Sequence, residues 1–89
     1  MASMEYAQGF AADVAQIGSQ QVEAHLVRVL RMLEAFPLSG SPDVPASIVR
    51  EFGPGVRKCV VRPFDLVYEY DDARDVVFVH GLVRQRMAR

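Results

Sequence analysis

The residues best able to do chemistry in this chain are bases in its C-terminal half. Arg57 and Lys58 begin the segment RKCVV, Arg62 follows that segment, and Arg84 and Arg86 end the last apolar segment, DVVFVHGLVRQR. Cations gathered at one place can neutralise phosphates, or stabilise the charge that builds on phosphorus when a 2′-hydroxyl attacks it. The same residues also fit a plainer interpretation, in which they are solvated charges paired with neighbouring carboxylates.

Metal binding and nucleophilic catalysis have weaker support. His25, His80 and Cys59 are scattered without zinc-ligand spacing, and a lone cysteine in RKCVV is typical of a small buried side chain. His80 alternates with apolar residues, so we expect a half-buried, hydrogen-bonded histidine that needs a second group to move a proton. The residues expected on its face are Val76, Phe78 and Leu82. We predict no metal and no cofactor.

Composition limits the classes of function. The chain has 89 residues, of which 51% are hydrophobic and 24% charged, which predicts a single globular domain spanning residues 1–89. A net charge of −1 is far from that of a dedicated nucleic-acid binder, so any phosphate contact has to be local. One cysteine and the lack of a charged-then-apolar leader predict a cytoplasmic protein, and no apolar run is long enough to cross a membrane.

The N-terminal half predicts a helical hairpin over about residues 7–36. Phe10, Val14 and Ile17 recur at helical spacing until Gly18, and Ser19 is a suitable N-cap for a second helix that ends at Pro37. The second helix has a broad apolar stripe made of Val22, Leu26, Val29, Leu30, Leu33 and Phe36. The preceding residues, MASMEYA, fit either a frayed end or a short edge strand.

The C-terminal half predicts a sheet. A connector over residues 37–46 is rich in proline, glycine and serine, and the apolar spacing beyond it shifts toward alternation. We expect strands over residues 47–52, 56–61, 65–70 and 75–83, followed by a basic tail over 84–89. Because the turns are short, the strands should pair antiparallel. The predicted fold class is therefore α+β, a helical hairpin packed on a curled antiparallel sheet of three to four strands.

With this order of elements, the chain resembles the RelE/ParE superfamily of toxins from bacterial type II toxin–antitoxin pairs. The resemblance rests on FAADVAQI, FPLSGSPD, GPGVRKCVVRPFDLVYEYDD and DVVFVHGLVRQR, which match the family's helical hairpin, connector, tyrosine-bearing strand and terminal strand with a basic end. It covers nearly the whole chain, and it rests on the order and spacing of these segments together.

The resemblance implies a growth-inhibiting toxin, associated with plasmid stabilisation, that a cognate antitoxin protein neutralises. Members of the family either cut mRNA in the ribosomal A site or poison DNA gyrase without chemistry of their own. The ribosome with its mRNA, gyrase and a second copy in a homodimer are therefore the further partners to consider. Two alternatives stay open: a catalytically silent module that keeps the fold and its antitoxin, and a stand-alone domain whose sheet serves another protein contact.

The resemblance also implies roles for individual residues. Lys58 falls where ribonuclease members keep a basic residue on the second strand, and Arg84 falls where they keep a catalytic arginine or histidine near the end of the last strand. Arg86 is the basic residue just after it. Tyr68 matches the family's strand tyrosine, for which we expect a packing role. Under the mRNA-interferase reading, Arg84, Lys58 and Arg86 are the catalytic candidates, and Arg57 and Arg62 join them in binding nucleic acid.

Asp65 departs from the family pattern. Ribonuclease members commonly place an arginine at this position to hold the scissile phosphate. A carboxylate repels a phosphate unless it is protonated or paired, so Asp65 argues against mRNA endoribonuclease activity by the usual arrangement. Such activity would require Arg57 or Arg62 to take the place of the missing arginine.

Overall fold

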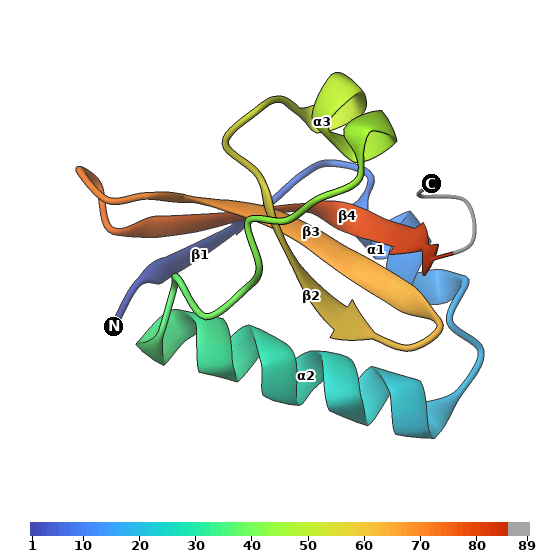
Figure 1. Ribbon diagram of the computed structural model, residues 1–89. Coiled ribbons are helices and arrows are strands. Elements are labelled where there is room, and N and C mark those ends of the chain that lie inside the picture. Colours follow the sequence, from blue (N-terminus) through green and yellow to red (C-terminus); the bar gives the residue numbers. More distant parts are fainter. Residues whose placement is uncertain (86–89) are drawn as a thin grey trace.

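The computed structural model describes residues 1–85, which form three helices and four strands (Figure 1). In chain order these are β1 (Ser3–Tyr6), α1 (Phe10–Ala15), α2 (Gln20–Ala35), α3 (Ala46–Phe52), β2 (Arg57–Val61), β3 (Phe64–Asp71) and β4 (Val76–Arg84). The strands make one sheet in the order β1-β4-β3-β2. Helix α2 lies across one face of this sheet and α3 lies over the other, which confirms the predicted α+β class.

The sheet is mixed rather than wholly antiparallel. Strands β2, β3 and β4 pair antiparallel as predicted, whereas β1 runs parallel to β4, with Ser3 opposite Val76 and Tyr6 opposite Val79. A short turn forces its two strands to be antiparallel, but β1 and β4 are separated by every other element and are free of that constraint. Of the two possibilities for MASMEYA, the edge strand is the one that forms.

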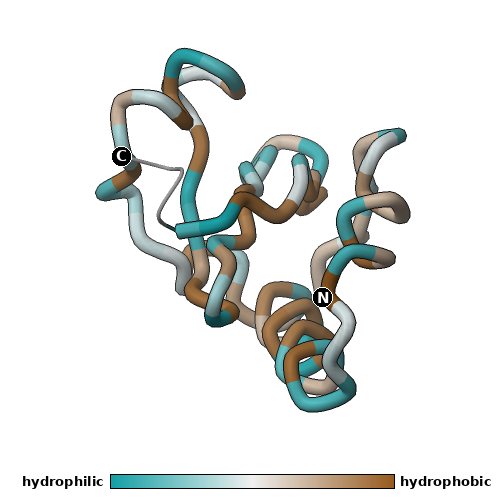
Figure 2. Tube along the Cα trace, turned by 90° about the vertical axis from the view of Figure 1, so that its right-hand side faces the viewer, coloured by the Kyte–Doolittle hydropathy of each residue, from teal (hydrophilic) through white to brown (hydrophobic). Residues whose placement is uncertain are grey.

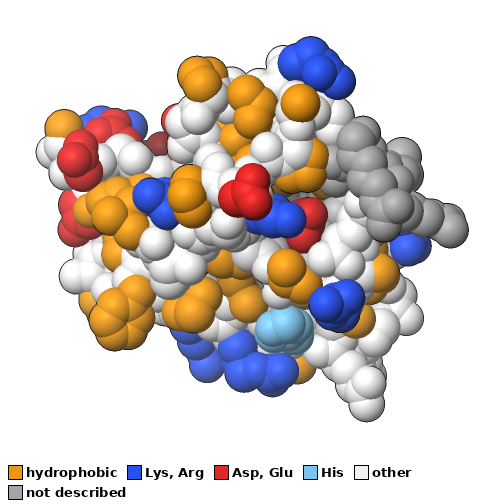
Figure 3. Space-filling model, viewed as in Figure 1, with side chains coloured by type: hydrophobic (Ala, Val, Ile, Leu, Met, Phe, Trp, Pro, Cys, Tyr) orange, Lys and Arg blue, Asp and Glu red, His pale blue; other side chains and the backbone are white. Residues whose placement is uncertain are grey.

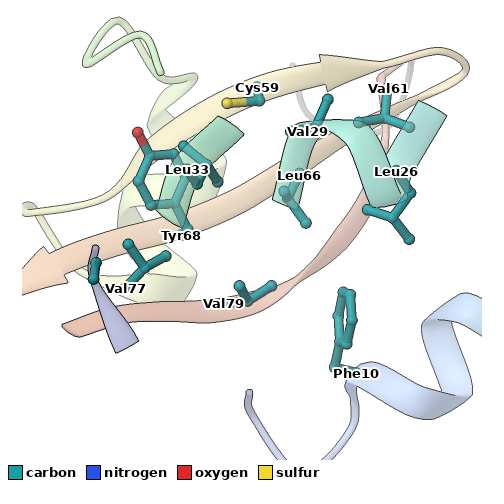
Figure 4. Packing of buried hydrophobic residues seen from close by; sticks show 11 residues of the cluster. Phe10, Leu26, Val29, Leu33, Cys59, Val61, Leu66, Tyr68, Val77 and Val79 are labelled. Atoms are coloured by element: carbon teal, nitrogen blue, oxygen red, sulfur yellow. The ribbon is translucent and has the colours of Figure 1, made fainter. Parts of the chain in front are cut away.

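The predicted helical hairpin is confirmed, with α2 as its long arm. The Ser19 hydroxyl caps α2 by accepting a hydrogen bond of 3.3 Å from the Val22 amide, and Gly18 adopts a positive φ of 64° in the turn before it. Figure 4 shows Leu26, Val29 and Leu33 of α2 pointing at the sheet. They pack against the side chains of Val61, Leu66, Tyr68, Val77 and Val79.

The hydrophobic residues gather where the layers meet, as the trace in Figure 2 shows. Val27 and Met32 lie off the buried stripe of α2 and are 45% and 39% exposed, so no other part of residues 1–85 covers that side of the helix. None of the helices in this part of the chain has the length and apolar character that spanning a bilayer requires.

The strand predicted over residues 47–52 is wrong, because this segment is helix α3. Its apolar residues Ile48 and Phe52 are four apart and share one helical face, which packs on the sheet beside Val56, Val67 and Val83. Pro45 stands at its N-cap, and Gly53, with a φ of 103°, follows its last residue. In so short a segment the apolar pattern fits a helix and a strand equally well.

A β-bulge divides β4 at His80. Val67 pairs with Gly81 while the next residue, Tyr68, pairs with Val79, so His80 is an extra residue on β4. Consequently Val79 and Leu82 both face α2, and the prediction that Leu82 shares a face with His80 is wrong.

Asp13 of α1 fixes the backbone at this bulge. Its Oδ2 accepts a hydrogen bond of 3.1 Å from the Leu82 amide. A Cβ at Gly81 would lie 2.6 Å from the same oxygen, so a larger residue there would displace the carboxylate from this position.

Tyr68 ties the connector to the sheet. Its hydroxyl, at the end of a fully buried side chain, donates to the Pro37 carbonyl at 2.7 Å and accepts from the Gly40 amide at 2.9 Å. Arg57 donates to the Gly40 carbonyl at 2.8 Å and to the Leu38 carbonyl at 3.3 Å. The packing role expected for Tyr68 therefore includes one buried and one partly buried hydrogen bond.

We expect Tyr68→Phe to lower the free energy of unfolding by about 1–3 kcal/mol, because it strands a buried backbone donor and a backbone acceptor. Urea unfolding followed by circular dichroism measures this loss. Tyr70→Phe is the matched control, because the Tyr70 hydroxyl bonds only Asp75, at 2.7 Å and in an exposed position, and little change is expected there. Equal losses in the two variants would contradict a special role for Tyr68.

The Cys59 thiol should be unreactive in the folded protein. Burial raises its pKa from 9.0 to about 11, because the charged thiolate is poorly solvated under α2. Folding therefore favours the protonated thiol. Its contribution to the free energy of unfolding is complete below pH 9.0 and is lost as the pH rises through about 11. Wild type should lose stability more steeply than Cys59→Ala across this interval in urea unfolding. Parallel curves for the two proteins would refute the assignment.

Candidate functional site

The basic residues singled out from the sequence do not converge on one rim of the sheet. Lys58 lies on the face beneath α3, since its neighbour Cys59 packs on the α2 side. Arg84 lies on the α2 face instead, opposite Phe64 in the register, with its guanidinium carbon 5.1 Å from the centre of the Phe64 ring. The two principal catalytic candidates are thus separated by the sheet itself.

Arg57 and Arg62 mark opposite ends of β2. Arg57 begins the strand and is bonded to the connector carbonyls, whereas Arg62 follows its last residue and is exposed. The two arginines are five positions apart, which corresponds to about 17 Å along an extended chain. Arg62 shares its end of the sheet with Arg84, because Val61 pairs with Phe64 and Phe64 pairs with Arg84. Arg86 lies outside the described residues.

Asp65 is buried and paired with Lys58. It is 2% exposed, and its Oδ2 lies 3.8 Å from Nζ of Lys58, whose side chain is 26% exposed. The Gln85 amide donates a 3.2 Å hydrogen bond to Oδ1 of the same carboxylate. Asp65, which stands where the resemblance leads us to expect an arginine, therefore neutralises the nearest basic candidate. Gln85, which the sequence did not single out, completes this group.

A second polar pair lies on the same face. His80 Nε2 is 2.7 Å from Oε1 of Glu69, and the imidazole sits between the rings of Phe52 and Phe78, with centroid distances of 5.2 and 4.9 Å. The His80 side chain is 18% exposed. Glu69 is the second group that a proton-transfer role for His80 requires, and the sequence alone gave no register to identify it. Lys58 and His80, which both lie under α3, thus each face a carboxylate of the sheet.

Among the hollows on the surface of residues 1–85, one is polar and one is apolar. The more polar one lies at the end of β4, with Phe64 and Arg84 among its lining residues, which also include Asp13, Gln16, Glu51, Leu82 and Val83. The more apolar one follows α2 and is lined by residues 35–39 and Tyr70, with Phe36 and Leu38 exposed by 67% and 60%. Within residues 1–85, no three side chains of His, Cys, Asp or Glu are grouped in a way that could hold a metal ion.

The arrangement favours contact with another protein over cleavage of RNA. Cleavage requires cations at the scissile phosphate together with a general base within reach. Here Lys58 is paired with a buried anion, and Arg84 lies on the other side of the sheet. Of the candidate cations, Arg62 and Arg84 stay exposed, and so do the apolar residues after α2, which suits contact with another protein.

The Lys58–Asp65 pair should respond asymmetrically to removal of either partner. We expect Lys58→Met to lower the free energy of unfolding by about 1–3 kcal/mol, because it leaves the Asp65 carboxylate buried without its cation. Asp65→Leu should have a smaller effect, since the partly exposed Lys58 can extend into water. The double variant should recover most of the loss. Urea unfolding of all three variants tests this, and equal losses in the two single variants would contradict it.

Solved structures of other proteins have the same fold as this chain. Two crystal structures share the fold, and both are 18% identical to this chain in sequence with a TM-score of 0.70 over 94% of it. One is the intact E. coli RelBE toxin–antitoxin complex, and the match covers 96% of the aligned chain in that structure. The other is the isolated E. coli RelE toxin in its P21 form, covered over 84%. No curated protein sequence matches the chain.

The sequence itself gives the family. Residues 4–89 match the family described as the ParE toxin of the type II toxin–antitoxin system parDE. This match spans the helical hairpin, the connector and all of β2, β3 and β4. The chain therefore belongs to the ParE toxin family, within the RelE/ParE group of type II toxin–antitoxin systems.

Proposed function

We propose that this chain is a toxin that arrests growth by binding DNA gyrase in the cytoplasm, and that it does not cut mRNA. The observation that carries this proposal is the buried Asp65, which neutralises Lys58 at the position where ribonuclease members hold a phosphate. A toxin that poisons gyrase needs no chemistry of its own, so it can lose the phosphate site and keep its activity.

The contacts with gyrase are assigned to the exposed cations at one end of the sheet. Arg62 and Arg84 are exposed there, and Arg86 follows in the sequence. We propose that they serve as binding residues rather than catalytic ones. Charges at the rim of an interface act mainly on the rate of association. Under this proposal Lys58 has a structural role, because its charge is taken up by Asp65.

A cognate antitoxin is part of the same proposal. Support comes from the description of the family, which is defined by toxin–antitoxin pairs, and from the RelBE structure, in which a toxin of the same fold is complexed with its antitoxin. The exposed Phe36 and Leu38 beside the apolar hollow are suited to be covered by such a partner. A short reading frame next to the gene should encode it.

Induced expression in a host without the antitoxin separates the possible activities. We expect growth arrest with gyrase-linked DNA breaks, while cellular mRNA stays intact within translated codons. Arg62→Ala with Arg84→Ala should weaken gyrase binding by about tenfold, or about 1.4 kcal/mol, and relieve the arrest. Lys58→Ala, provided that it accumulates as folded protein, should still arrest growth, and Arg31→Ala on the exposed side of α2 is the matched control.

Other outcomes would replace the proposal. Cuts within codons that disappear in Lys58→Ala would restore the ribonuclease interpretation. Normal growth at a level of folded protein that blotting and circular dichroism verify would instead identify a silent module.

A further inference from the structure

Asp65 has a second partner besides Lys58. Its Oδ1 accepts a hydrogen bond of 3.2 Å from the side-chain amide of Gln85, while its Oδ2 lies 3.8 Å from Nζ of Lys58. The backbone amide of Gln85 also donates to the Pro63 carbonyl at 3.1 Å. Gln85 is therefore attached twice, by its backbone to the turn before β3 and by its side chain to β3 itself.

The two ends of this side-chain contact differ in how firmly the sheet holds them. Asp65 is 2% exposed and lies within the ladder, paired with Val83 of β4. Gln85 lies beyond the last pair of that ladder, which joins Phe64 to Arg84. A hydrogen bond to a charged acceptor is stronger than one between neutral groups. The fixed carboxylate can therefore restrain the end of β4.

Arg84 is the residue that this restraint affects most. Its guanidinium carbon lies 5.1 Å from the centre of the buried Phe64 ring, and its side chain is exposed. Within residues 1–85, Arg84 makes no ion pair. Figure 3 shows acidic and basic side chains in contact below α3, whereas basic side chains over β2 and α2 stand apart from acidic ones. Asp65 thus compensates the charge of Lys58 and leaves that of Arg84 available to a partner.

We propose that Asp65 positions Arg84 through Gln85, so that the guanidinium stays over Phe64 and is presented to a partner protein. Without the Asp65–Gln85 bond the end of β4 would fray, because a strand end beyond its ladder has few contacts. Fixing an exposed arginine in advance removes part of the entropy that binding would otherwise cost. Naming gyrase as the partner rests on the proposed function, whereas the positioning does not.

Hydrogen exchange followed by NMR measures the restraint on the strand end. The reporter is the backbone amide of residue 85, and the reference is the Leu82 amide, which Asp13 holds. Gln85→Met keeps the length of the side chain and removes its donors. After correction for intrinsic rates, it should speed exchange of the reporter about tenfold relative to the reference, as expected for one lost hydrogen bond.

The NMR resonances of Arg84 report its position directly. In the wild-type chain the ring current of Phe64 should shift the side-chain protons of Arg84 upfield. In Gln85→Met these protons should move toward their random-coil positions. A change in overall stability alone would not move them, because they report the folded state.

Two variants of Asp65 separate its hydrogen bond from its charge. Asp65→Asn keeps a side-chain oxygen that accepts from Gln85, so the reporter amide should stay protected. Asp65→Leu removes the acceptor and should act like Gln85→Met. Lys58→Met leaves the Asp65–Gln85 bond in place, and it should therefore leave the reporter unchanged relative to the Leu82 reference.

Binding to purified gyrase tests the consequence for the partner. Gln85→Met alters no charge and should weaken binding about three- to tenfold, the range expected when one side chain has to be ordered on binding. Gln21→Met makes the same chemical change at an exposed position of α2 and should bind like wild type.

The proposal is overturned if Gln85→Met leaves the residue 85 amide and the Arg84 resonances unchanged, or if Asp65→Asn loosens the strand end as much as Asp65→Leu does. A looser strand end with unchanged affinity for gyrase would overturn it as well. If the wild-type chain fails to bind gyrase while the exchange results are as expected, the gyrase proposal is lost and the positioning of Arg84 by Asp65 stands.

Discussion

The hydrogen bonds of the Tyr68 hydroxyl are the constraint on which the rest of the structure depends. The end of α2 and the start of α3 are joined by a connector that contains no helix or strand of its own. A fully buried phenol fixes this connector at Pro37 and Gly40, and Arg57 holds the same stretch from the strand beside it. The next residue, Ser41, exchanges backbone hydrogen bonds with Lys58 of β2, and the chain then leads into α3. The tyrosine expected to serve packing therefore also anchors the chain where it passes from α2 toward α3.

The sequence predicted those parts of the fold in which local pattern and tertiary packing agree. Helix α2 has a long apolar stripe, an N-cap at Ser19 and a proline after its end, so each signal indicates the same element. Helix α3 was missed because Ile48 and Phe52 fit either period over seven residues, and the sheet beneath decides between them. The parallel pairing of β1 could not be predicted from local sequence patterns, because its partner β4 lies near the other end of the chain.

The candidate site was predictable by residue type but not by position. The sequence indicated that Asp65 would be paired with a nearby cation, and in the structure this cation is Lys58. It could not show that Gln85 completes the group, or that Glu69 reaches His80, because both contacts depend on register. For the cations to converge, their strands would have to be neighbours and their side chains would have to point to the same face of the sheet. The order places Arg84 near the start of β3, but the face places it away from Lys58.

The bulge at His80 decides that face. Upstream of it Val77 and Val79 point toward α2, and in a regular strand the following even-numbered residues, Arg84 among them, would point toward α3. One extra residue reverses this assignment for the end of β4. A last strand of the same length without a bulge would place its terminal arginine on the same side as Lys58, whereas removal of the extra residue would leave the arginine opposite Phe64 on the α2 face. The bulge, and not the length of β4 alone, therefore decides whether the cations of β2 and β4 share one surface or are divided between two.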